Sequence, residues 1–311
     1  METPQSAILT EAGRYAAFII LNVDASATAC QCVIQKSRGF PALLDELSHQ
    51  HPDAGLVGTV AFGAHFWERI SLQAKPIQLR AFTALDGPVH HAPASGGDVF
   101  IHVHSERVDL NFLTLQNFYR GLAGQVAVLD EVYGFQYLDS RDLTGFIDGT
   151  ENPQGKARSP VALIGAEDPD FAGGSYVLTQ RYVHHLEQWG WLDVHDQERV
   201  IGRTKADSRE LDEAEKPASA HISRVVIEEQ GEELEIVRHS MPYGRVSGDS
   251  GLFFLAYSRD LTVFDRMLAR IYGTADDGLA DHLLDYTSPQ SGAYFFAPAL
   301  ELLEELPNHS G

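Results

Sequence analysis

The chain alternates between short apolar runs and segments with helical periodicity. Four times an apolar or alternating run passes into a helical pattern, and this recurrence predicts duplicated βα units. The strands predicted from these runs span residues 15–23, 56–62, 99–103, 175–180 and 252–257. The predicted helical segments are one that ends near residue 48, and residues 110–122, 182–189 and 261–272. Each half of the chain therefore contains two strand-helix pairs.

The repeated order of strand, helix and strand predicts the fold class. It fits a ferredoxin-like α+β unit in each half, with an antiparallel sheet and helices packed on one face. We predict an N-terminal half at residues 1–150 and a C-terminal half at 151–311, sharing one interface. Residues 145–174 are rich in Gly, Pro, Asn and Asp and predict the connecting region, whereas the charged residues 206–220 predict a solvated loop.

Composition and charge narrow the classes of partner. The 311 residues include 44 acidic and 23 basic side chains, a formal charge of −21, which disfavours nucleic acid and anionic membrane surfaces as partners.

Cys30 and Cys32 are too close for the usual disulfide and have the wrong spacing for a redox CxxC pair. The start shows no secretory signal, and no apolar run reaches the ~18 residues of a membrane span. We expect a soluble, cytoplasmic protein.

Residues 145–153 read Gly-Phe-Ile-Asp-Gly-Thr-Glu-Asn-Pro and place Asp148 on a tight, glycine-flanked turn. Asp-Gly and Asn-Pro are also typical of an ordinary turn, so this segment alone leaves both interpretations open. Further segments carry histidine and arginine: His-Ile-Ser-Arg at 221–224 and Arg-His-Ser-Met-Pro-Tyr-Gly at 238–244. His221 starts an alternating run, which places its imidazole at the end of a strand or in the preceding turn.

Together these three segments resemble the dye-decolourising haem peroxidases, in particular their compact bacterial B-type group. Gly-Arg-Thr-Lys at 202–205 and Leu-Leu-Asp-Tyr-Thr at 283–287 are also similar to this family. The resemblance covers most of the chain, with the motifs in the expected order. It implies a noncovalently bound haem b, reduction of hydrogen peroxide through a ferryl intermediate, and oxidation of dyes, phenolics or other small reductants. It also fits the homo-oligomer that we expect from exposed hydrophobic faces.

The resemblance implies a role for three residues on the proximal side of the haem. His221 is implied as the axial ligand of the iron, and Asp285 as the carboxylate that accepts the other ring proton of His221. Asp285 follows two leucines and is equally compatible with a polar helix end. Arg203 in the Gly-Arg-Thr-Lys segment is implied as the partner of a haem propionate, because guanidinium groups bind carboxylates well.

On the distal side the resemblance implies roles for Asp148, Arg238 and Ser240. Asp148 would carry a proton between the two oxygens of peroxide, and Arg238 would stabilise the negative charge that develops on the leaving oxygen. The Ser240 hydroxyl would hold a distal water. Taken without the resemblance, Arg238 would more often be an arginine paired with one of the nearby glutamates.

Other interpretations remain open from the sequence. His102 and His104 are two apart on a predicted strand and face one side, as a chelating pair would, with His90 and His91 nearby, although no third ligand has a recognisable spacing. Carboxylates at 210–215 suggest a cation site. Residues 148–152 lack the glycine and terminal glutamate of a calcium-binding EF-hand. A noncatalytic haem carrier, or a protein that removes iron from haem, would share His221, but it gains little from Asp148 and Arg238.

Overall fold

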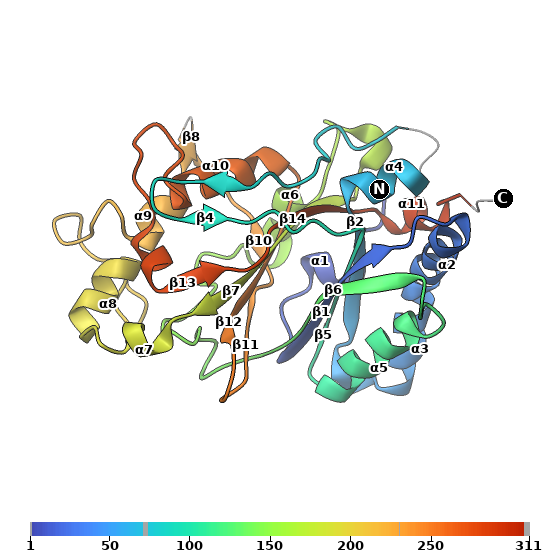
Figure 1. Cartoon of the computed structure of the whole chain (residues 1–311), viewed down its shortest axis with the longest axis horizontal. Helices are drawn as coiled ribbons and strands as arrows, with labels where there is room; N and C mark the ends of the chain where they lie inside the picture. Colours follow the sequence, from blue (N-terminus) through green and yellow to red (C-terminus); the bar gives the residue numbers. More distant parts are fainter. Residues whose placement is uncertain (1, 71–73, 230, 308–311) are drawn as a thin grey trace.

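The structure, a computed structural model, describes residues 2–70, 74–229 and 231–307 (Figure 1). The first part of the chain forms β1 (Tyr15–Val23), β2 (Val57–Phe62), β3 (Leu85–Asp86), β4 (His91–Ala92), β5 (Val99–Ser105) and β6 (Val126–Phe135), with helices α1 (Ser6–Leu9), α2 (Ala27–Arg38), α3 (Phe40–Gln50), α4 (Ala64–Ile70) and α5 (Val108–Tyr119). The short 3-10 helix η1 (Pro52–Ala54) follows α3.

The second part forms β7 (Ser175–His184), β8 (Glu228–Glu229), β9 (Glu232–Glu233), β10 (Val237–Arg238), β11 (Met241–Gly244), β12 (Ser250–Ser258), β13 (Thr287–Pro289) and β14 (Ala293–Ala297). Its helices are α6 (Arg158–Ala162), α7 (Leu186–Trp189), α8 (Val194–Ile201), α9 (His221–Val225), α10 (Leu261–Ile271) and α11 (Leu300–Glu304), and its 3-10 helices are η2 (Gly155–Ala157), η3 (Pro169–Phe171) and η4 (His282–Asp285).

Eight strands close into a ring that contains four strands from each part of the chain. Hydrogen-bonded neighbours run in the order β12, β11, β6, β1, β5, β2, β14 and β7, and β7 pairs again with β12. The pairings between these strands are antiparallel, as the α+β prediction with antiparallel sheets requires. The two parts meet at single residue pairs, Tyr243 with Gly134 and Phe296 with Phe62. The sheets of the two ferredoxin-like halves are thus joined into one barrel.

Alternation along the strands separates two hydrophobic cores. On β1, Ala16, Phe18 and Ile20 belong to the core inside the barrel, whereas Ala17 and Ile19 belong to the core under the helices. Because successive strand side chains point to opposite faces, a strand with both faces buried becomes a continuous apolar run. This explains why the run at 15–23 contains little polar sequence.

The helices cover the ring at two ends of the molecule. Figure 1 shows α2, α3 and α5 together beside the N-terminal strands, and α8, α9 and α10 at the opposite end. The apolar face of α10 buries Leu261, Phe264 and Leu268. Among the described residues, none of the helices has the length and apolar character that a membrane span requires.

Three predicted elements differ from the observed ones. The helix predicted at 182–189 is wrong at its start, because Tyr182 and His184 continue β7 and pair with β12 and β13. The helix predicted to end near residue 48 is two helices, since Gly39 ends α2 and begins α3. His221 begins the short helix α9 rather than standing at the end of a strand.

Aromatic stacking inside the barrel joins the two parts of the chain, which yields a stability prediction. Phe18 is 1% exposed and its ring lies 4.2 Å from that of Phe253, centroid to centroid. We expect Phe18→Ala to lower the free energy of unfolding by about 3–5 kcal/mol, because the truncated side chain leaves a cavity. Chemical denaturation followed by circular dichroism measures this change.

The matched control is Phe112→Ala, since Phe112 is 50% exposed on α5. Its effect should stay within about 0.5 kcal/mol. Equal effects of the two substitutions would contradict the assignment of Phe18 to the core that joins the two parts.

Candidate active site

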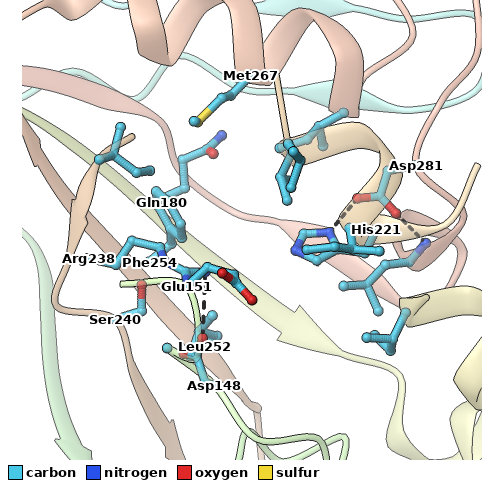
Figure 2. Close-up of a pocket in the computed structure, with 18 of the residues that line it drawn as sticks. Asp148, Glu151, Gln180, His221, Arg238, Ser240, Leu252, Phe254, Met267 and Asp281 are labelled. Carbon is cyan, nitrogen blue, oxygen red and sulfur yellow. Dashed lines mark hydrogen bonds and ion pairs between the residues drawn. The ribbon is translucent and has the colours of Figure 1, made fainter. Parts of the chain in front are cut away.

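A cavity lies between the outer face of β7 and β12, the helices α9 and α10, and the segments around residues 148 and 238. Its walls are mostly apolar. Two groups of polar side chains are important for the chemistry, His221 with Asp281, and Asp148 with Arg238 and Ser240; the other polar lining residues include Glu151, Gln180, His184 and Arg203. Figure 2 shows these two groups on opposite sides of the opening. The apolar lining residues include Leu178, Ile222, Val226, Ile236, Leu252, Phe254, Phe264, Met267, Leu268, Leu283 and Leu284.

His221 is held on one side of the cavity by Asp281. The His221 Nδ1 atom lies 2.6 Å from Asp281 Oδ2, and the Asp281 side chain is 1% exposed. Burial lowers the pKa of His221, but the Asp281 carboxylate more than offsets this effect and raises the pKa above its usual value. Since Nδ1 is engaged by the carboxylate, Nε2 is the nitrogen left for a ligand.

The prediction that Asp285 accepts the ring proton of His221 is wrong. Asp285 stands at the end of η4, is half-exposed, and contacts His90 Nε2 at 2.9 Å. Asp281 precedes η4 and caps it, accepting a hydrogen bond from the Leu283 amide at 2.8 Å. One carboxylate oxygen thus begins the helical turn while the other orients His221. An Asp four residues before Asp285 is compatible in the sequence with a helix N-cap, but its contact with His221 depends on the three-dimensional structure.

The segment around Asp148 is shaped by two glycines with left-handed backbone. Gly145 has φ +89° and Gly149 has φ +79°, conformations that favour glycine. A Cβ at Gly145 would also come within 2.7 Å of the Lys205 side chain. The segment contains two tight turns, at 142–145 and 149–152, and Asp148 lies between them rather than on either turn.

Asn152 ties this segment to the strand that carries Arg238. The Asn152 Nδ2 atom donates to the Arg238 carbonyl at 2.9 Å, and the Arg238 amide donates to Asn152 Oδ1 at 2.9 Å. The Asn152 side-chain amide thus bonds both backbone groups of residue 238, as a neighbouring strand would. Asn152 is a positioning residue that the sequence showed only as part of a turn.

Arg238 and Ser240 reach the cavity because of strand alternation. Arg238 Nη1 lies 3.8 Å from Asp148 Oδ1, a distance at which the opposite charges attract. Ser240 Oγ accepts a weak hydrogen bond from the Leu255 amide at 3.3 Å, which leaves the hydroxyl hydrogen available to the cavity. The structure therefore brings Asp148, Arg238 and Ser240 together, facing His221.

Arg203, which follows Gly202 in the sequence, borders the same cavity. Gly202 ends α8 with φ +91°, and a Cβ there would meet the Ile222 side chain at 2.3 Å, so glycine lets this segment approach α9. The Arg203 Nη1 atom donates to the Ser208 carbonyl at 2.8 Å, and Nη2 pairs with Glu151. The buried Nε has no partner among the described residues.

Other predicted features have plainer outcomes. In β12 the run 252–257 is shared between two faces: Leu252 and Phe254 line the cavity, whereas Phe253, Leu255 and Tyr257 face the barrel interior.

The carboxylates at 210–215 do not gather around an open site, because Glu210 and Glu213 both pair with Lys216. Cys30 and Cys32 are both free thiols.

Comparison with known proteins places these features in a family. Residues 5–136 match the family model for the N-terminal domain of Dyp-type peroxidases, and residues 139–302 match that for the C-terminal domain. A dye-decolorizing peroxidase of Mycolicibacterium paratuberculosis is 40% identical over 294 residues, which is 94% of this chain and 82% of that protein.

Solved structures agree with the sequence comparison. A dye-decolorizing protein from V. cholerae is 48% identical with a TM-score of 0.92, over 97% of this chain and 99% of that one. A variant of DypB from Rhodococcus jostii RHA1, solved in complex with heme, is 38% identical with a TM-score of 0.94, over 98% and 99% of the two chains. With both domain models matched in order along nearly its whole length, this chain belongs to the Dyp-type peroxidases.

Proposed function

We propose that this chain holds haem b noncovalently in the cavity beside His221, reduces hydrogen peroxide there, and oxidises dyes, phenolics or other small reductants. The observation that carries the proposal is the arrangement of His221, with its Nε2 directed to the cavity, opposite Asp148, Arg238 and Ser240. Family membership supports a peroxidase over the haem carrier considered from the sequence. Haem binding by the related DypB variant supports the choice of cofactor.

The residues around the cavity fit a porphyrin. Its faces and edges are apolar, and the leucines, isoleucines and phenylalanines of the lining offer matching surface, of which burial is favourable at about 25 cal/mol per Å². The polar requirements of haem are an axial nitrogen and partners for its propionates. His221 supplies the first, and the Arg203 guanidinium, which borders the cavity, supports the second.

The pairing of His221 with Asp281 makes the imidazole a stronger electron donor. A carboxylate that accepts the Nδ1 proton increases the basicity of Nε2 and fixes the orientation of the ring. When bound, haem supplies a redox-active iron whose oxidised states such a donor favours. The short 2.6 Å contact and the near-complete burial of Asp281 support a strong interaction.

On the opposite side we assign proton transfer to Asp148 and charge stabilisation to Arg238. Asp148 accepts a proton from one oxygen of peroxide and returns it to the other, so that the departing oxygen leaves as water. The Arg238 guanidinium carries a fixed charge and lowers the energy of negative charge developing on that oxygen. The Ser240 hydroxyl holds a water between them.

We also propose that the protein is a cytoplasmic homo-oligomer. Free thiols at Cys30 and Cys32 are compatible with a reducing compartment. Strand β6 exposes Val128 by 41% and Leu129 by 44%, apolar surface that a second copy would cover. Sedimentation velocity at several concentrations tests the oligomeric state.

The experiment that tests the function is the absorption spectrum of His221→Ala. We expect the wild-type protein reconstituted with haem to give a Soret band that shifts within milliseconds to seconds of mixing with hydrogen peroxide. His221→Ala should lose stable haem binding, because the iron loses its protein ligand. A variant with the full band and an unchanged spin state would refute the axial assignment, and a wild-type protein that only bleaches slowly would refute the peroxidase.

Substitutions of Arg238 and Asp148 separate the effect of charge stabilisation from that of proton transfer. Arg238→Leu removes the cation and should slow the peroxide-dependent spectral change by about 10²-fold or more, measured by stopped flow. Asp148→Asn keeps the shape and removes the base, and we expect a smaller decrease. Rates that equal the wild-type rate in Arg238→Leu would exclude Arg238 from the reaction.

A comparison of Asp281→Asn with Asp285→Asn tests the carboxylate assignment. Asp281→Asn should slow the reaction with peroxide by about 10–100-fold and raise the reduction potential of the iron, because the imidazole donates less strongly. Asp285→Asn should leave both quantities unchanged, since Asp285 contacts His90 and His282 instead. Spectroelectrochemistry measures the reduction potential, and stopped flow measures the rate of reaction with peroxide. A larger effect of Asp285→Asn than of Asp281→Asn would show that Asp285 is the partner of His221.

A further inference from the structure

The segment His-Ile-Ser-Arg that carries His221 also carries a buried arginine to which the proposed function gives no role. Arg224 lies three residues after His221 on α9, so the two residues are neighbours on the helix surface. Arg224 is 2% exposed and is not among the described residues that line the cavity. It is therefore placed to act on the protein around His221 rather than on a bound haem.

The guanidinium of Arg224 joins α9 to the chain that leads to Asp281. Its Nη1 and Nη2 atoms donate to the two carboxylate oxygens of Asp277 at 2.7 and 3.0 Å, a bidentate pair. Its Nε donates to the Arg270 carbonyl at the end of α10, at 3.1 Å. In return, Arg270 Nη2 donates to the Ser223 carbonyl of α9 at 2.5 Å. These four hydrogen bonds hold α9 against the end of α10 and the loop that follows it.

Asp281 is anchored at the same end of α10. Its amide donates to the Ile271 carbonyl at 2.8 Å, and Ile271 directly follows the residue whose carbonyl Arg224 engages. The last carbonyls of a helix have no partner within the helix, so they are free to accept such bonds. The helix that carries His221 and the carboxylate that orients it are thus both bonded to adjacent carbonyls of one helix end.

Helix α9 has only five residues and depends on contacts of this kind. A helix shorter than about 12 residues is not stable on its own, because its first turn is costly to form. On the N-terminal side of α9, the His282 amide donates to the Ser219 carbonyl at 2.9 Å. On the C-terminal side, the corresponding bonds are those of Arg224. The orientation of the His221 imidazole therefore depends on both attachments.

Stability alone does not account for an arginine at this position. A buried guanidinium loses its hydration, and apolar side chains in place of a buried ion pair are often neutral or stabilising. Asp277 is 50% exposed, so water weakens its attraction for Arg224. What arginine supplies here is a rigid, planar fork that bonds a carboxylate and a carbonyl at the same time, which the single ammonium of lysine does not match.

We propose that Arg224 is a positioning residue that holds the imidazole of His221 against Asp281. The inference rests on the proposed function, in which His221 is the axial ligand. The 2.6 Å contact between His221 Nδ1 and Asp281 Oδ2 requires a fixed separation between α9 and the start of η4. Asp281 keeps its own bond to α10 when Arg224 is replaced, so the imidazole moves and the carboxylate stays. An imidazole without this partner is a weaker donor to iron.

Resonance Raman spectroscopy of the reduced holoprotein tests the proposal, because the frequency of the iron–histidine stretch reports how strongly the imidazole donates. Arg224→Met keeps an apolar stem and removes the guanidinium. We expect the stretch to move to lower frequency, in the same direction as in Asp281→Asn. Transfer of haem to apomyoglobin should become faster by about tenfold. A folded Arg224→Met protein with the wild-type frequency would overturn the proposal.

If Arg224→Met fails to fold, Asp277 tests the same contact from its half-exposed side. Asp277→Asn removes the charge that Arg224 pairs with, and it should shift the stretch in the same direction by a smaller amount. Asp277→Glu keeps a carboxylate and should retain the wild-type frequency. An unchanged frequency in Asp277→Asn, or equal shifts in Asp277→Asn and Asp277→Glu, would count against the pair.

The matched control is Arg259→Met. Arg259 also forms a bidentate pair, with Glu167, and its remaining bond is to the Pro160 carbonyl rather than to α9. Arg259→Met should leave both the stretch and the transfer of haem unchanged. A shift equal to that of Arg224→Met would show a general effect of lost stability and would contradict a positioning role.

Failure of the proposed function has a different signature. Wild-type holoprotein that lacks an iron–histidine stretch would refute His221 as the axial ligand, and the role of Arg224 with it. A wild-type stretch that Arg224→Met leaves unchanged would refute the role of Arg224 alone.

Discussion

The structure depends on one stretch of chain, residues 237–241, which forms a wall between the barrel interior and the cavity. From Val237 to Met241 the side chains alternate, so that Val237, His239 and Met241 enter the barrel while Arg238 and Ser240 reach the cavity. The neighbouring β12 follows the same rule with Phe253 inside and Phe254 outside. A shift of register by one residue would exchange the two sets and place a guanidinium in the apolar barrel, which is costly enough to hold the register.

The active-site arrangement follows from this wall and from the elements that approach it. Helix α9 presents His221 from across the cavity, and Gly202 permits the approach of the segment that carries Arg203. The loop with Asp148 is fastened to the wall through Asn152. Residues far apart in sequence thus converge through separate attachments: His221 through its contact with Asp281, and Asp148 through the hydrogen bonds of Asn152 to residue 238.

Much of the fold was predictable because the strands are apolar on both faces. The runs at 15–23 and 252–257 were visible for that reason, and the helix at 261–272 was visible from its periodicity. The continuation of β7 through Tyr182 was missed because its polar residues suit a strand only once β12 and β13 lie beside it. In the site, motif residues such as His221 and Arg238 were recognisable, but Asp281 was not. Its role rests on a helix cap that also reaches His221, and such a double use depends on three-dimensional contact.

The two hydrogen bonds of Asn152 engage the backbone of residue 238 and leave its side chain untouched. The attachment of the loop through Asn152 therefore does not require a particular side chain at position 238. During divergence of related enzymes, the guanidinium can be exchanged for another group without releasing the neighbouring carboxylate, so the chemistry of this wall can be altered one residue at a time while its architecture persists.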